Sequence, residues 1–219
     1  MSADLATYTL NGLHGFVAVT CLTALTEKGF EVFPTDDTIF QHELDSLRDV
    51  EFAGIKIGLL PTVSVAEKAL DFIKQRPGVP VVLDPVLVCK ETHDVAVSAL
   101  CQELIRFFPH VSVITPNLPE AELLADQEIK TLEDMKTAAQ KLHDLGAPAV
   151  IIKGGNRLSQ DKAVDVFYDG QTFASSIASH LVKGDELLPA VESSKAFVYR
   201  SIAQADQYGV RQYEANQNN

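Results

Sequence analysis

Two carboxylates and an amide follow apolar, β-branched runs of the sequence, a placement that favours metal and phosphate chemistry. Asp84 follows the run 81–83, and Asn117 and Glu120 follow the run 111–114. In an open parallel sheet such strand ends meet at one edge, where ligands bind. Two carboxylates and an amide there could hold hydrated Mg²⁺ beside phosphates. The plainer alternatives are that Asn117 caps a helix, that Glu120 favours the positive end of that helix, and that Asp84 caps a turn.

These residues belong to a repeating pattern of strands and helices. Periodicity predicts strands at 16–23, 54–59, 81–84, 111–114, 149–153 and 163–168. It predicts helices at 4–11, 35–48, 63–75, 95–107, 119–125 and 132–145, with more helices later. The helix at 132–145 has the clearest signals, because Thr131 and Asp134 can form a capping box and Gly146 can end it. Strands that alternate with helices predict an α/β fold with a mostly parallel sheet.

Composition agrees with one enzyme-sized domain over residues 1–219. The hydrophobic fraction of 46% can form one sizeable core, while residues 206–219, rich in Gln and Asn, should be loosely packed. A net charge of −12 argues against a nucleic-acid surface. No stretch approaches the roughly 18 apolar residues of a membrane span, and no signal segment opens the sequence. The three cysteines lack the spacing of a zinc site or a disulfide framework. We therefore expect a cytoplasmic protein.

Five segments, in order, resemble the hydroxymethylpyrimidine and pyridoxal kinases of the ribokinase-like superfamily. They are AGIKIGLLPT at 53–62, PVVLDPVLVCK at 80–90, VSVITPNLPEAELL at 111–124, VIIKGGN at 150–156 and KAVDVFYDG at 162–170. The resemblance covers nearly the whole chain. It implies a three-layer α/β/α sandwich, a homodimer, and transfer of a phosphoryl group from ATP, with Mg²⁺, to the hydroxymethyl group of pyridoxal or pyridoxine. The alternative substrate is hydroxymethylpyrimidine or its phosphate, from thiamin biosynthesis.

The resemblance also implies roles for single residues. Asp84 and Glu120 would organise the metal ion. The nucleotide side would include Asn117, Glu120, Lys153, Gly155, Asp165 and Thr172. Cys89 and Lys90 would belong to a lid, and Asp4 and His14 would lie on the substrate side. A thiolate at Cys89 could add reversibly to the aldehyde of pyridoxal. The plainer alternatives are a buried thiol for Cys89, a solvated turn lysine for Lys153 and a helix-dipole role for Asp4.

Two segments of the family pattern are absent, near residues 2/3 and 171/172. Asp169-Gly170 predicts a hairpin, yet the helical spacing of Phe173, Ile177 and Leu181 follows without a returning strand. The family has here a loop that surrounds the transferring phosphate and carries the general base, a Cys or an Asp. No catalytic base is therefore visible before Thr172. We expect the intact protein to contain both segments, and the alternative is a non-catalytic relic of the fold.

Overall fold

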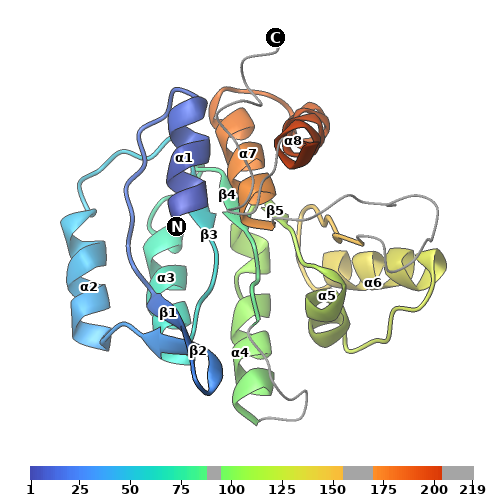
Figure 1. Ribbon diagram of the computed structural model, residues 1–219, viewed down its shortest axis with the longest axis horizontal. Helices are drawn as coiled ribbons and strands as arrows, with labels where there is room; N and C mark the ends of the chain where they lie inside the picture. The colour runs from blue at the N-terminus through green and yellow to red at the C-terminus, as the bar shows by residue number, and fades with distance from the viewer. Residues whose placement is uncertain (88–94, 155–169, 204–219) are drawn as a thin grey trace.

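The computed structural model describes residues 1–87, 95–154 and 170–203 and contains a parallel sheet between two layers of helices (Figure 1). The strands β3 (Ile55–Ile57), β4 (Val81–Leu83) and β5 (Val113–Ile114) pair in that order, and both pairings are parallel. Parallel bridges from Ile114 to Val150 and from Asn117 to Lys153 place residues 149–153 beside β5. The predicted three-layer α/β/α fold is confirmed, while the strand predicted at 163–168 lies outside the described residues.

Alternating side chains of the strands give the sheet two apolar faces. Ile57, Leu83 and Ile114 pack into a core with α3 (Val63–Lys74) and α4 (Val95–Ile105). Val82 and Val113 point to the other face and pack against α7 (Gly170–Val182) and α8 (Leu187–Ala203). The helix α1 (Ser2–Leu10) packs beside α7 in this second layer.

The remaining helices lie beside these layers. The helix α2 (Asp37–Ser46) packs on α3, and α5 (Leu118–Ala125) packs on α6 (Leu132–Asp144). A short 3₁₀ helix, η1, spans Phe108–His110. The capping box predicted for α6 is present, since Thr131 and Asp134 exchange hydrogen bonds. Gly146 follows that helix with φ +112°, a conformation that suits glycine. The helices predicted from local signals are thus confirmed.

The strand predicted at residues 16–23 is wrong. The chain instead forms an antiparallel hairpin of β1 (Cys21–Thr26) and β2 (Gly29–Pro34), separate from the parallel sheet. Gly29 adopts φ +100° after the short turn, and the Thr26 hydroxyl accepts a hydrogen bond from the Lys28 N–H. Because both faces of this hairpin are largely exposed, its sequence has no clear alternation of buried and exposed positions to indicate the strands.

The helix α7 runs without interruption from Gly170 through Gln171 and Thr172 to Val182. Gly184 follows it with φ +89°, which agrees with the predicted stop at this glycine. Whether the intact protein has further residues near 2/3 and 171/172 stays a prediction. None of the helices in the described ranges is long and apolar enough to cross a membrane.

Candidate active site

A buried ion pair lies at the carboxyl end of the parallel sheet. The Nζ atom of Lys153 is 2.7 Å from Oδ1 of Asp84, and the two side chains are only 7% and 1% exposed. The hydroxyl group of Thr115 donates a hydrogen bond to the same oxygen at 3.3 Å. The backbone brings these groups together, because Thr115 N–H bonds to the Leu83 carbonyl and Lys153 N–H to the Pro116 carbonyl. Lys153 is therefore a buried cation and not a solvated turn lysine.

Glu120 and Asn117 occupy the first turn of α5 at the same sheet edge. The Glu120 N–H donates to Asn117 Oδ1 at 2.9 Å, and the Asn117 N–H donates to Glu120 Oε2 at 2.8 Å. This capping box confirms that Asn117 caps the helix, and it also fixes the carboxylate of Glu120, which is 4% exposed. A local helix signal therefore positions a buried carboxylate close to Asp84 and Lys153.

Burial raises the pKa of Glu120 to about 7, because an ionised carboxylate loses its hydration there. The Asn117 backbone N–H and the charge of Lys153 lower this pKa, the charge of Asp84 raises it, and the Leu87 backbone N–H lowers it. Asp84 and Glu120 thus repel each other, and the charge of Lys153 offsets part of that repulsion. A cation bound here would reduce that repulsion and favour the ionised form of Glu120.

These residues fit a magnesium ion that is held together with phosphates. Mg²⁺ is commonly bound by one or two carboxylates, with water and phosphate oxygens in the other positions. Asp84 and Glu120 supply two carboxylates, and no group of three or more His, Cys, Asp or Glu side chains gathers within the described part of the chain. The donor set is therefore typical of a shared metal and phosphate site and not of a metal cage built by protein alone.

Asp4 and His14, the two residues expected on the substrate side, have different surroundings in the structure. Asp4, in the first turn of α1, forms an ion pair with Lys56 of β3, with 3.3 Å between Oδ1 and Nζ. His14 is exposed and packs edge-on against Phe16 with 5.0 Å between ring centroids. The ring contacts continue through Phe52 to Phe72 near the end of α3, so His14 is not brought beside the carboxylates.

Other predicted site residues lie outside the described structure. Cys89, Lys90, Gly155 and Asp165 are in the ranges 88–94 and 155–169, and only the backbone of Thr172, within α7, is described. Their roles stay predictions. Sequence reasoning missed Lys56 and Thr115. The available signal for Lys56 was its place between two isoleucines of a predicted strand, because a lysine that a sheet covers needs a charged partner.

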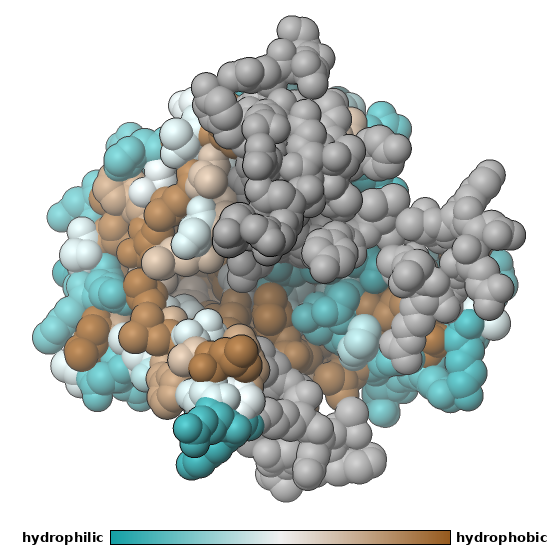
Figure 2. Space-filling view, viewed as in Figure 1, coloured by the Kyte–Doolittle hydropathy of each residue, from teal (hydrophilic) through white to brown (hydrophobic). Residues whose placement is uncertain are grey.

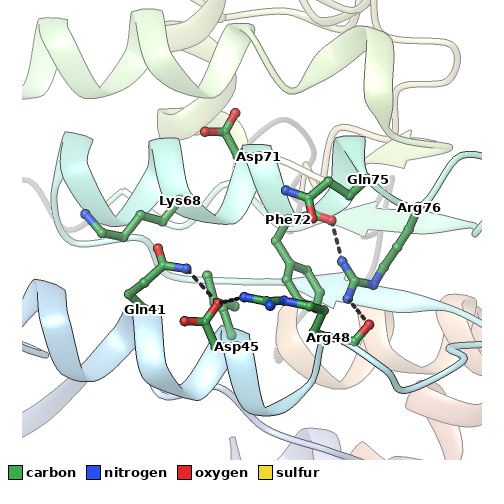
Figure 3. Close-up of a pocket in the computed structure, with 9 residues that line it drawn as sticks. Gln41, Asp45, Arg48, Lys68, Asp71, Phe72, Gln75 and Arg76 are labelled. Atoms are coloured by element: carbon green, nitrogen blue, oxygen red, sulfur yellow. Dashed lines mark hydrogen bonds and ion pairs between the residues drawn. The ribbon is translucent and has the colours of Figure 1, made fainter.

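A separate hollow lies between α2 and α3 (Figure 3). Much of its polar lining is internally paired, since Arg48 bonds to Asp45 at 2.7 Å and Arg76 donates to the carbonyls of Phe72 and Arg48. The guanidinium of Arg76 also stacks over the Phe72 ring at 3.5 Å from its centroid. This hollow is formed by the helix layer and contains none of the strand-end residues, so we do not assign the chemistry to it.

Comparison with known proteins identifies the class of protein. The family model described as Phosphomethylpyrimidine kinase matches residues 1–173. A pyridoxine kinase of Bacillus subtilis is 35% identical over 231 residues, which cover 94% of this chain and 85% of the relative. A hydroxymethylpyrimidine/phosphomethylpyrimidine kinase of Aquifex aeolicus is 33% identical, covering 94% of this chain and 90% of the relative.

Solved structures agree with this result. An ADP complex of Bacillus subtilis pyridoxal kinase superposes with a TM-score of 0.90 at 32% identity and covers 100% of this chain and 93% of that one. Staphylococcus aureus pyridoxal kinase in complex with AMP-PCP and pyridoxal gives a TM-score of 0.88 at 28% identity, covering 100% and 89%. The fold is that of the ribokinase-like kinases. The chain belongs to the phosphomethylpyrimidine kinase family.

Proposed function

We propose that the protein transfers the γ-phosphoryl group of ATP to the hydroxymethyl group of pyridoxal or pyridoxine. The observation that carries this proposal is the buried cluster of Asp84, Lys153 and Glu120 at the carboxyl end of the sheet. A structural relative, the Staphylococcus aureus enzyme, binds AMP-PCP and pyridoxal. Relatives named for pyridoxine and for hydroxymethylpyrimidine match this chain at 35% and 33% identity, so hydroxymethylpyrimidine or its phosphate is the alternative acceptor.

Each residue of the cluster has a proposed role. Asp84 and Glu120 would hold Mg²⁺, directly or through water, and Mg²⁺ would neutralise phosphate charge as transfer proceeds. Lys153 keeps Asp84 in place through the 2.7 Å ion pair and adds positive charge beside the phosphates. Asn117, fixed by its capping bonds, would bind a phosphate oxygen or its water.

The transfer itself forms a bond between the acceptor oxygen and the γ-phosphorus and breaks the bond to the leaving ADP oxygen. The acceptor hydroxyl gives its proton to a general base, which the family resemblance places in a loop before Thr172. Correct placement and charge neutralisation provide most of the rate enhancement in reactions of this kind.

Product analysis tests the proposal. Purified protein with ATP and MgCl₂ is incubated with pyridoxal, pyridoxine or hydroxymethylpyrimidine, and phosphorylated products are separated by chromatography. We expect a higher kcat/KM with the two B6 vitamers. A higher value with hydroxymethylpyrimidine would select the thiamin-pathway function. Absence of every product in protein shown to contain the complete chain would overturn the kinase proposal.

We also propose that the protein is a cytoplasmic homodimer that pairs through its hairpin. Leu22, Leu25, Phe30 and Phe33 of β1 and β2 are all exposed, and Figure 2 shows apolar side chains gathered on the left half of the visible face. A two-stranded hairpin is rarely stable without packing partners. Light scattering after size exclusion should give a dimer mass, and Leu25→Glu, at 85% exposure, should shift it toward the monomer. A monomeric wild-type protein would overturn this assembly.

A further inference from the structure

Thr115 follows β5 directly and is a fully buried polar residue, with 0% of its surface exposed. Its backbone N–H bonds to the Leu83 carbonyl at 2.9 Å, which fixes it beside the end of β4. Its hydroxyl group donates to Oδ1 of Asp84 at 3.3 Å. A hydroxyl group buried this deeply is costly without a partner, and the carboxylate of Asp84 is the partner that makes it tolerable here.

Alternation along the strands places Asp84, Thr115 and Lys153 on the same face of the sheet. Each comes two residues after an apolar residue that packs with α7 and α8, and these apolar residues are Val82, Val113 and Ile151. Residues two apart in a strand point to the same face. The three polar side chains therefore continue this apolar face at its carboxyl edge.

Lys153 reaches across β5 to form its ion pair with Asp84. Residues 149–153 lie beside β5, and β5 lies between them and β4, which Asp84 follows. Because adjacent strands are about 4.8 Å apart, the lysine spans roughly 10 Å between the two outer backbones. Thr115 belongs to the chain between them and points to the same face. Its short side chain leaves the lysine room to cross, whereas a large one would lie in its path.

Two donors thus converge on a single oxygen of Asp84. The Nζ atom of Lys153 lies 2.7 Å from Oδ1, and the Thr115 hydroxyl lies 3.3 Å from the same atom. One donor alone leaves a carboxylate able to turn about its bond to the β-carbon, because the minimum of that torsion is broad. Two donors from different chain segments restrict this rotation. Neither of them uses Oδ2, the oxygen that can then bind Mg²⁺ or its water.

We propose that Thr115 is a positioning residue for phosphoryl transfer, because its hydroxyl group holds the carboxylate of Asp84 in the orientation that binds Mg²⁺. This inference rests on the proposed kinase function and adds a residue that acts through the metal ligand. The hydroxyl group contributes orientation alone, since Lys153 already supplies the positive charge. Removing a partner that orients a metal ligand typically costs roughly 10- to 100-fold in metal affinity or activity.

Nucleotide binding tests this role without relying on turnover. Isothermal titration calorimetry measures the affinity for ADP with MgCl₂ and again with EDTA, and the ratio of the two affinities gives the contribution of the metal ion. We expect Mg²⁺ to strengthen ADP binding to the wild-type protein. Thr115→Val keeps the shape of the side chain and removes the hydroxyl group, so it should lower this ratio roughly 10-fold and leave the affinity in EDTA unchanged. Thr115→Ser keeps the hydroxyl group and should retain the wild-type ratio.

A matched variant separates positioning from stability. Thr7 is also 0% exposed, but its hydroxyl group donates to a backbone carbonyl, that of Ala3 in α1. Thr7→Val should therefore keep the wild-type ratio even if it lowers the melting temperature. Thermal unfolding of each variant reports on folding, and Thr115→Ala replaces Thr115→Val if the valine variant does not fold. In kinetics, the same Thr115 variant should need more Mg²⁺ for half-maximal rate at an unchanged KM for the acceptor.

The outcomes distinguish the two proposals. An unchanged ratio in folded Thr115→Val, or in Thr115→Ala if the valine variant does not fold, would overturn the role of Thr115 and leave the kinase proposal intact. An equal loss in Thr115→Ser would do the same, because it would assign the effect to packing. Equal ADP affinity of the wild-type protein with and without Mg²⁺ would also overturn the role. If the wild-type protein phosphorylates no acceptor, the kinase proposal fails and the inference fails with it.

Discussion

Glu120 combines two properties in one side chain, because it completes a helix cap and carries a carboxylate beside Asp84 and Lys153. Replacement by glutamine separates these properties. The amide oxygen of the introduced glutamine can still accept the hydrogen bond from the Asn117 N–H, as glutamine does in natural capping boxes. The variant therefore removes the charge and retains the local fold.

We predict that Glu120→Gln lowers phosphoryl transfer on the order of 10²-fold, because one charge that organises the metal is lost. Steady-state kinetics beside thermal unfolding provide the measurement. Glu133→Gln is the control, since Glu133 lies exposed on α6 in a surface pair with Lys136 and should have no effect. Wild-type turnover in a folded Glu120→Gln protein would show that Glu120 acts only as a helix-capping residue.

The raised pKa of Glu120 also predicts how stability depends on pH. Its pKa rises from 4.5 to about 7 on folding, so between these values the folded state binds more protons than the unfolded state. The free energy of unfolding should therefore fall as pH rises through this window, by roughly 3 kcal/mol from this group. Urea unfolding from pH 4 to 8 without Mg²⁺ measures the slope. Glu120→Gln should remove this component, and an identical slope in the variant would contradict the assignment.

Cys89 allows a prediction about substrate chemistry, although it lies outside the described residues. A thiol can add to the aldehyde of pyridoxal but not to the alcohol of pyridoxine. Cys89→Ser should therefore lower kcat/KM more for pyridoxal than for pyridoxine and leave the KM for ATP nearly unchanged. A buried structural thiol would instead give equal losses and a decrease in stability of ~1 to 3 kcal/mol. Kinetics with both vitamers and the melting temperature distinguish these outcomes.

At the scale of elements, two helices begin with the same device but differ in position. Asn117 is the N-cap of α5 at the proposed active site, and Thr131 is the N-cap of α6, later in the sequence. Each forms a complete capping box. A comparison of the two caps can therefore separate a structural contribution from a catalytic one.

We predict that Asn117→Ala and Thr131→Ala each lower the free energy of unfolding by about 1 kcal/mol, the usual effect of losing a cap. Only Asn117→Ala should also reduce kcat, because its amide is proposed to bind phosphate or water. Chemical unfolding and steady-state kinetics on both variants test this. Equal kinetics for the two would show that Asn117 acts as a cap alone.

Local signals explain which elements could be predicted from the sequence. The helices α2, α3, α5 and α6 have side-chain caps, and apolar periodicity indicates the other helices. The strand ends at Asp84 and Asn117 follow short apolar runs, so these elements were found. The hairpin of β1 and β2 was missed because apolar residues are exposed on both of its faces, so its sequence shows no clear alternation of apolar and polar positions. The ion pair of Asp4 with Lys56 was missed because its members are distant in sequence and meet only when α1 packs beside the sheet.

At the scale of the whole molecule, Gly170, Gln171 and Thr172 lie in one continuous helix, α7. This allows a test of whether the intact protein has further residues at this place. We predict that the intact protein contains an additional loop near 171/172 with a Cys or Asp base, because phosphoryl transfer requires a proton acceptor. Intact-mass spectrometry should then give a mass above 23.9 kDa, and peptide mapping should locate the extra residues. A mass of 23.9 kDa together with a contiguous Gln171-Thr172 peptide would support the non-catalytic relic.

The packing of α7 on the sheet has a consequence for synthesis of the chain. Gly54 must lack a side chain there, since a Cβ would lie 2.5 Å from the Val182 side chain. Val82 and Val113 share this face and are fully buried. The helices α7 and α8, which pack on them, are translated long after them. At about 5 to 20 residues per second, the half-built sheet waits several seconds on the ribosome while α7 and α8 are still missing from one apolar face. The nascent chain should therefore be most prone to aggregate, and most dependent on chaperones, during that interval.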